Sequence, residues 1–232
     1  MNTTTETTEL RRRLGGAALV VAPLVLLAAA LIHPKETTDP AHQLQIVAGG
    51  LNRWYLAHLL YIVGFAAFVP AVLALGSRLR ASAPRLELWG AGLAVVGLFS
   101  SAGIVAIEGF GSWQLAQAAD RGVAVDVLDR IVHSAGVVVP FGIIGLAVPA
   151  GLIVLAVGVA RSRSAAPWVA WTLAAGAVLL AIGLGGTIKP ALVAGIAALA
   201  VAMGTIGLGD LGAGVESSAL SRRSPAPHPA AG

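Results

Sequence analysis

Six stretches of almost uninterrupted apolar residues, separated by short polar segments, dominate the 232-residue chain. They cover residues 14–32, 54–76, 88–107, 137–160, 167–184 and 188–208. An α-helix rises 1.5 Å per residue, so about 20 residues cross the roughly 30 Å hydrocarbon core of a bilayer. The pattern therefore predicts an all-α polytopic membrane protein, a bundle of six transmembrane helices, of which only 167–184 is marginal in length.

The polar segments divide the chain into three parts. Residues 1–13 are expected to form a cytoplasmic N-terminal tail, 14–209 the six-helix transmembrane domain, and 210–232 a disordered cytoplasmic tail rich in Ser, Pro and Ala. An alternative for the first span is a secretory signal, because three arginines precede it and Ala28–Ala30 offers a cleavage site. We expect a retained helix, since the apolar run continues through Leu31 and Ile32.

Composition supports lipid exposure of the apolar residues. Hydrophobic residues make up 57% of the chain and charged residues 11%, whereas a soluble domain carries about 25% charged residues. Cysteine is absent, which excludes disulfides, thiol nucleophiles and thiolate metal sites. The net charge of +4 does not indicate nucleic-acid binding, because the basic residues are scattered over short loops. The expected partner is the lipid bilayer, with another membrane protein or a second copy of the chain left open.

The distribution of basic residues predicts the orientation, because cytoplasmic loops are enriched in Lys and Arg. With the N-terminus inside, ten basic residues are cytoplasmic and five are external. The inner ones are Arg11, Arg12, Arg13, Arg78, Arg80, Arg85, Arg161, Arg163, Arg222 and Arg223; the outer ones are Lys35, Arg53, Arg121, Arg130 and Lys189. This predicts a multi-pass plasma-membrane protein with both termini cytoplasmic, and Trp54 and Trp113 in the outer aromatic belt.

Side chains suited to proton or metal chemistry gather at the outer face. Counting 1.5 Å per residue places His58 about 27 Å and Glu108 about 30 Å above the inner boundary, so these two side chains are expected to meet. Trp54, Tyr61, Phe65 and Phe68 share the helix face of His58, and the small residues of 88–107 are expected to receive these rings. The candidate ligand-binding residues are His58, Tyr61, Glu108 and His133.

The position of His133 leaves three kinds of site open. On a straight helix it lies about 40 Å up, and kinks at Pro140 and Pro149 would bring it closer to the other two side chains. One candidate is a zinc or other divalent metal site made by His58, Glu108 and His133. Another is a haem held between His58 and His133, and a third is a structural His–Glu contact that joins two spans. Glu36, Asp39 and His42 are read as a solvated loop, with a weak metal site as the alternative.

The functional prediction follows from these candidates. The first hypothesis is a non-enzymatic protein, either a partner subunit or a small-ligand binder, that uses the outer face. The alternative is a metal- or haem-dependent membrane enzyme using His58, Glu108 and His133, and a further one is a small transporter with a proton relay. The chain contains neither a GxSxG motif nor a phosphate-binding Gly-Lys-Ser/Thr loop. A partner subunit would use an exposed seam such as Ala194, Ala198 and Ala202.

Two similarities complete the sequence analysis. Residues 78–84 resemble 161–167, which suggests that spans two–three and four–five are duplicated hairpins, although loops of Arg, Ala, Ser and Pro also match by chance. The second similarity concerns the ends of the spans. The chain has His33-Pro34 after the first span, Trp54 and His58 at the start of the second, and Glu108-Gly109 at the end of the third. With these residues the chain resembles small multi-spanning membrane proteins of high-GC bacteria, a group whose layout implies no activity.

Overall fold

The computed structural model describes residues 3–185 and 188–223, with side chains for 6–185 and 188–212, and this part of the chain is helical without strands. Its elements are α1 (Thr3–Ile32), α2 (Pro40–Ala48), α3 (Leu51–Ser77), α4 (Pro84–Leu115), α5 (Arg121–His133), α6 (Ala135–Val137), the π-helix η1 (Val138–Ile143), the 3₁₀ turn η2 (Ile144–Leu146), α7 (Ala147–Ser162), α8 (Pro167–Gly185) and α9 (Lys189–Arg223).

Six of these helical segments are long and apolar enough to cross a membrane, which confirms the predicted fold class. They are Glu6–Ile32, Leu51–Ser77, Pro84–Leu115, Ala135–Ser162, Pro167–Gly185 and Lys189–Gly212. The helices extend beyond the predicted spans. The segment 1–13 is helical from Thr3, and the segment 210–232, expected to be disordered, is helical as far as Arg223; residues 224–232 lie outside the described residues. Adding residues to an existing helix costs little, because nucleation is already complete.

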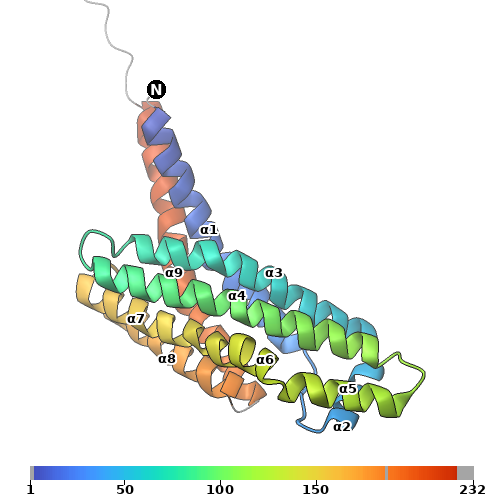
Figure 1. Ribbon diagram of the computed structural model, residues 1–232. Helices are drawn as coiled ribbons and strands as arrows, with labels where there is room; N and C mark the ends of the chain where they lie inside the picture. The colour runs from blue at the N-terminus through green and yellow to red at the C-terminus, as the bar shows by residue number, and fades with distance from the viewer. Residues whose placement is uncertain (1–2, 186–187, 224–232) are drawn as a thin grey trace, which may run out of the picture.

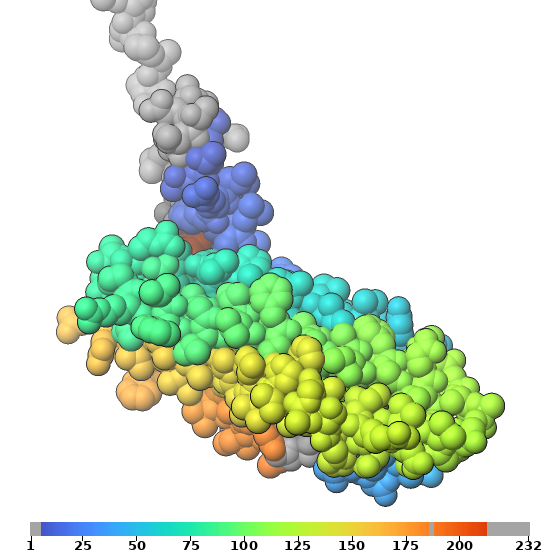
Figure 2. All heavy atoms as spheres, in the orientation of Figure 1, coloured from blue at the N-terminus to red at the C-terminus, as the bar shows by residue number. Residues whose placement is uncertain are grey.

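The six spans form a closed ring. Each packs mainly on two neighbours, in the order α1, α3, α4, α7, α8, α9 and back to α1. Figure 1 shows that the start of α1 and the last part of α9 leave the bundle together, at the end that we call the terminal end. The helices α2 and α5 cover the opposite end, called here the histidine end, and in Figure 2 the segment from α5 to η2 (yellow-green to yellow) lies beside α4 there.

Glycines decide which helices approach most closely. A methyl group at Gly90 would overlap Leu155 of α7, and one at Gly97 would overlap Val148. The small-residue stripe of α4 therefore receives α7, and the expectation that it receives the aromatic rings of α3 is wrong. In lipid, small residues mark a packing seam without saying which neighbour fills it. The alanine seam on α9 is exposed only in part, because Ala194 is exposed, Ala198 is half-buried and Ala202 is fully buried.

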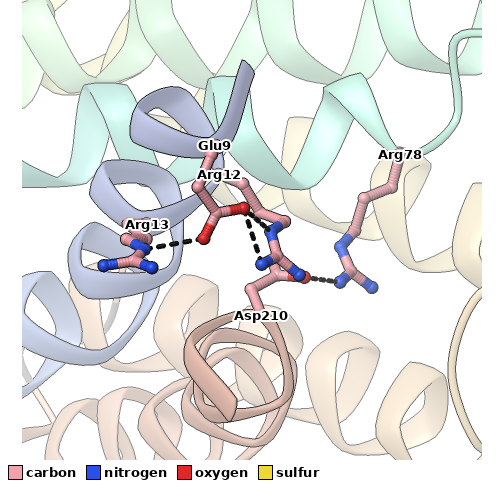
Figure 3. Close-up of polar contacts among 5 residues, drawn as sticks. All are labelled: Glu9, Arg12, Arg13, Arg78 and Asp210. Atoms are coloured by element: carbon pink, nitrogen blue, oxygen red, sulfur yellow. Dashed lines mark hydrogen bonds and ion pairs between the residues drawn. The ribbon is translucent and has the colours of Figure 1, made fainter. Parts of the chain in front are cut away.

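The terminal half of the ring is solidly packed. Leu75, Leu79, Leu152, Leu155 and Leu173 are fully buried there. Figure 3 shows the polar contacts beside them: Asp210 of α9 pairs with Arg78, which follows α3. On α1, Glu9 accepts hydrogen bonds from Arg12 and Arg13 at 2.7 Å each. The Arg78–Asp210 pair ties α9 to the α3–α4 turn at this end of the bundle, whereas the contacts of Glu9 lie within α1.

The fourth span is irregular over its first half. Ser134 is extended and separates α5 from α6, and a π-helix and a 3₁₀ turn follow before α7 begins. Pro140 lacks the N–H that a regular helix needs at this point, which explains the irregularity. The hydroxyl of Ser100 on α4 donates to the carbonyls of Pro140 and Phe141. This serine therefore joins α4 to the irregular segment.

The two predicted hairpins are present as α3–α4 and α7–α8, each with proline at the first position of its second helix. Their common origin stays a prediction. Leu19, Ala22 and Leu26 of α1 lie in the common core, and the retention of this span stays a prediction.

Candidate functional site

A cavity of about 460 Å³ occupies the histidine half of the ring. We call it the central cavity. All six spans, with α7 contributing Val148, and the η1–η2 segment contribute to its wall, which is mostly apolar towards the middle of the bundle. Leu26, Phe65, Phe68, Leu98, Leu180 and Leu199 line that part, whereas His33, Glu36, His58, Tyr61, Glu108 and Lys189 line the part nearer the histidine end.

A smaller cavity of about 250 Å³, the end cavity, lies beside it. Its wall includes Thr37 before α2, Ser112 on α4 and His133 on α5. Among the described residues, only Glu36 and Glu108 belong to the wall of both cavities. These two carboxylates therefore lie at the boundary between the two spaces.

The position of His58 is set by its own helix and by one glycine. Trp54, His58 and Tyr61 lie on one face of α3 at helical spacing and are buried. The His58 ring covers Gly109, at which a Cβ would overlap it, and the indole Nε1 of Trp54 donates to the Gly109 carbonyl at 2.7 Å. The second and third spans thus meet at the residue after Glu108, whereas a direct contact between His58 and Glu108 stays a prediction. Trp54 is only 2% exposed, so its assignment to an aromatic belt is wrong.

His33 was not among the candidates, yet it lies next to His58. Its ring centroid is 4.8 Å from those of both His58 and Trp54, and 5.7 Å from that of Tyr61. Its Nδ1 donates to the Pro34 carbonyl at 2.8 Å. The available signal in the sequence was the His-Pro pair directly after the first span, which depth counting along separate helices could not place against α3.

Glu36 belongs to the site as well, and the description of its loop as merely solvated is incomplete. Its Oε1 lies 3.5 Å from Nε2 of His33. Asp39, by contrast, caps α2 by accepting from the backbone N–H groups of Ala41 and His42. The loop thus sends one carboxylate to the cavities and uses the other to begin a helix.

Burial shifts the pKa values of His33 and Glu36, the two titratable side chains of this loop that line the central cavity. Burial, with smaller contributions from the charges of His58, Lys189 and Arg53, lowers the pKa of His33 to about 4, so this ring is neutral at pH 7. Burial also raises the pKa of Glu36. Because the Glu36 side chain is 44% exposed, solvent limits that shift.

His133 is not brought to the other candidates. It ends α5, its side chain is 69% exposed, and its Nδ1 lies 2.9 Å from the Asp129 carbonyl and 3.1 Å from Oδ1 of Asp129. The expected straight or kinked helix through His133 is wrong, because the chain is extended at Ser134. His133 lines the end cavity and His58 the central one.

This separation bears on the metal and haem hypotheses. In the described part of the chain no group of three or more His, Asp or Glu side chains is arranged to hold a metal ion. The set His58, Glu108 and His133 therefore lacks geometric support as a metal site, as does a haem between His58 and His133. Both hypotheses stay predictions.

Two cations near the cavity are directed to backbone carbonyls. Nζ of Lys189 donates to the carbonyls of Leu31 and His33, and Nε of Arg53 donates to that of Ile32. These are carbonyls at the end of α1, where a helix leaves its last C=O groups without intrahelical partners. Lys189 and Arg53 thus hold α1 against α9 and α3 at the cavity.

Comparison with known proteins gives no further guide, because the chain matches no protein-family model, no curated protein and no solved structure.

Proposed function

We propose that this protein is a non-enzymatic, multi-pass membrane protein that binds a small amphipathic molecule in the central cavity. The observation that carries the proposal is the cavity itself. Its volume of about 460 Å³ falls in the range of about 300–1,000 Å³ typical of small-molecule sites. Its apolar wall suits a hydrocarbon body, and the histidines and carboxylates at one end suit a polar head group.

The exposed side chains beside the central cavity favour entry of a ligand from the lipid. Val138 and Ile143 of η1 and Leu184 of α8 line the cavity and are also exposed on the surface of the bundle. In a membrane these side chains face acyl chains, so an amphipathic molecule in the leaflet at the histidine end would reach the cavity between η1 and α8. With the predicted orientation this is the extracytoplasmic leaflet of the plasma membrane.

Packing at the other end argues against a transport path. The cavity does not extend into the terminal half, where leucines such as Leu75, Leu152 and Leu155 fill the ring. An open channel needs a continuous path through both halves of the bundle, which the described residues do not leave in this conformation. The closed half suits a binding protein or the ligand-binding subunit of a larger assembly.

Native mass spectrometry of the protein in an uncharged detergent tests the proposal, with decanol as the probe. One decanol per chain is expected on the wild type. Val105→Trp, which fills the cavity from α4, should abolish binding, and Val96→Trp should not, because Val96 lies on the same helix but is 55% exposed. Equal decanol binding by both variants would contradict the proposal.

A further inference from the structure

The hydrogen bond of His58 fixes what this ring offers to the cavity. Its Nδ1 lies 2.9 Å from the Trp54 carbonyl, and a carbonyl only accepts, so Nδ1 carries the hydrogen. In the neutral imidazole Nε2 is then an acceptor. His58 is only 3% exposed, and Nε2 has no protein partner among the described residues. Since every fully buried side-chain nitrogen and oxygen in that part of the chain is hydrogen-bonded, Nε2 opens into the central cavity.

His33 presents a second acceptor by the same argument. Its Nδ1 donates to the Pro34 carbonyl, and the ring is neutral at pH 7. Nε2 therefore carries a lone pair, and it lies 3.5 Å from Oε1 of Glu36, which is also an acceptor when ionised. A donor placed between these two groups would satisfy both.

The two carboxylates complete a surface rich in acceptors. Glu36 and Glu108 line the same cavity and repel each other electrostatically, and neither forms an ion pair with a lysine or arginine within the described residues. Lys189, which also lines the cavity, and Arg53 donate to carbonyls at the end of α1 and not to these carboxylates. The polar end of the cavity thus combines two carboxyl groups with two imidazole lone pairs, and a cation bound there would favour the ionised form of both carboxyls.

A ligand that complements this surface supplies N–H donors and a positive charge. A protonated amine has both, and the rings of Trp54, His33 and Tyr61 around the site suit a cation as well. A carboxylate or phosphate head group would instead face two like charges. A bare ion would leave the apolar part of the cavity empty.

We propose that the central cavity selects amphipathic amines, with the ammonium group held by Glu36, Glu108 and Nε2 of His58 and the hydrocarbon chain directed towards Phe65, Leu98 and Leu199. This assignment rests on the proposed function, that the cavity binds a small amphipathic molecule. The assignment adds the chemical class of the head group, an amine, that the site prefers. The titratable and charged groups that face the ammonium position are His33, Glu36, His58, Tyr61, Glu108 and Lys189.

Three probes of equal chain length test the selectivity: decylamine, decanol and decanoate, each measured by native mass spectrometry in an uncharged detergent at pH 7. Decylamine should bind at least about tenfold more tightly than decanol, because a charge-assisted hydrogen bond is stronger than a neutral one. Glu108→Gln and Glu36→Gln should each weaken decylamine binding by about tenfold and leave decanol binding unchanged. Glu6→Gln is the control, since it removes a carboxylate of α1 at the terminal end.

The outcomes separate this inference from the proposed function. Decanoate binding as tight as that of decylamine, or an amine affinity unchanged in both Glu→Gln variants, would overturn the selectivity while the cavity remained a binding site. Failure of Val105→Trp to reduce binding of any probe would overturn the proposed function instead. The Glu→Gln variants are isosteric with the wild type, and equal melting temperatures of these proteins would show that a lost amine affinity does not come from misfolding.

Discussion

The indole Nε1 of Trp54 donates a buried 2.7 Å hydrogen bond to the backbone carbonyl of Gly109. This bond fixes α4 against α3 at the residue that follows Glu108. Because the His58 ring covers the same glycine, the bond also sets how the imidazole and the carboxylate face the central cavity. The two candidate side chains are thus positioned by backbone contact between their helices, without a direct bond between them.

Gly109 is therefore expected to be sensitive to the smallest enlargement. In Gly109→Ala the new methyl group would overlap the His58 ring, and we expect a loss of stability of about 1–3 kcal/mol together with weaker probe binding. Gly111→Ala is the matched control, because a Cβ there has no atom within 4 Å. Thermal unfolding in detergent measures both variants. Equal melting temperatures would show that the ring is free to move away.

The contact between Ser100 and the irregular fourth span predicts a second effect. Ser100→Ala removes the only side-chain donor recorded for the carbonyls of Pro140 and Phe141 in the described chain, and we expect a loss of about 1 kcal/mol and faster amide hydrogen exchange over 138–146. Thr205→Ala serves for comparison, since that hydroxyl bonds within its own helix, to Val201 at 2.8 Å. Unchanged exchange at η1 would mean that Ser100 does not hold the segment.

Stability should depend on pH through His33. Its pKa is lowered from 6.5 to about 4 in the folded state, so the neutral ring contributes stability that is fully present above pH 6.5 and is lost as the pH falls through 4. The full difference corresponds to about 3 kcal/mol. The raised pKa of Glu36 acts in the opposite direction, because protonation of this carboxyl is favoured in the folded state.

Melting curves of wild type, His33→Gln and His42→Gln between pH 7 and pH 4 separate these contributions. His33→Gln should flatten the loss of stability at low pH. His42→Gln should keep the wild-type slope, because that side chain is exposed on α2. A wild-type slope in His33→Gln would indicate that another group titrates instead.

The ion pair at the terminal end offers a test of how α9 is fixed. Arg78 and Asp210 have side chains only 27% and 18% exposed, so solvent screens this pair less than a surface pair. We expect Arg78→Gln to cost about 1–2 kcal/mol, and Arg80→Gln little, since Arg80 is 73% exposed in its pair with Glu87. In a double-mutant cycle, adding Asp210→Asn to Arg78→Gln should cost less than Asp210→Asn alone. Strict additivity would show that the pair contributes nothing.

The sequence by itself determined the six helices and the similar depth of His58 and Glu108 in their two helices. Both follow from the length of the apolar runs and the fixed rise of a helix, which can be evaluated for each helix separately. The position of Pro140 likewise marked an irregular place in the fourth span. What the sequence left open was the pairing of helices, because a span surrounded by lipid is apolar on all sides and shows no face that must turn inward.

Only the tertiary structure decided which residues share the central cavity. His33 and Glu36 lie outside any apolar run, and they reach His58 because ring closure brings the end of α1 against α3 and α9. His133 does not line the central cavity, because the extended backbone at Ser134 separates α5 from the helices of the fourth span. Such placements depend on contacts between segments far apart in the sequence, which neither hydropathy nor helical periodicity encodes.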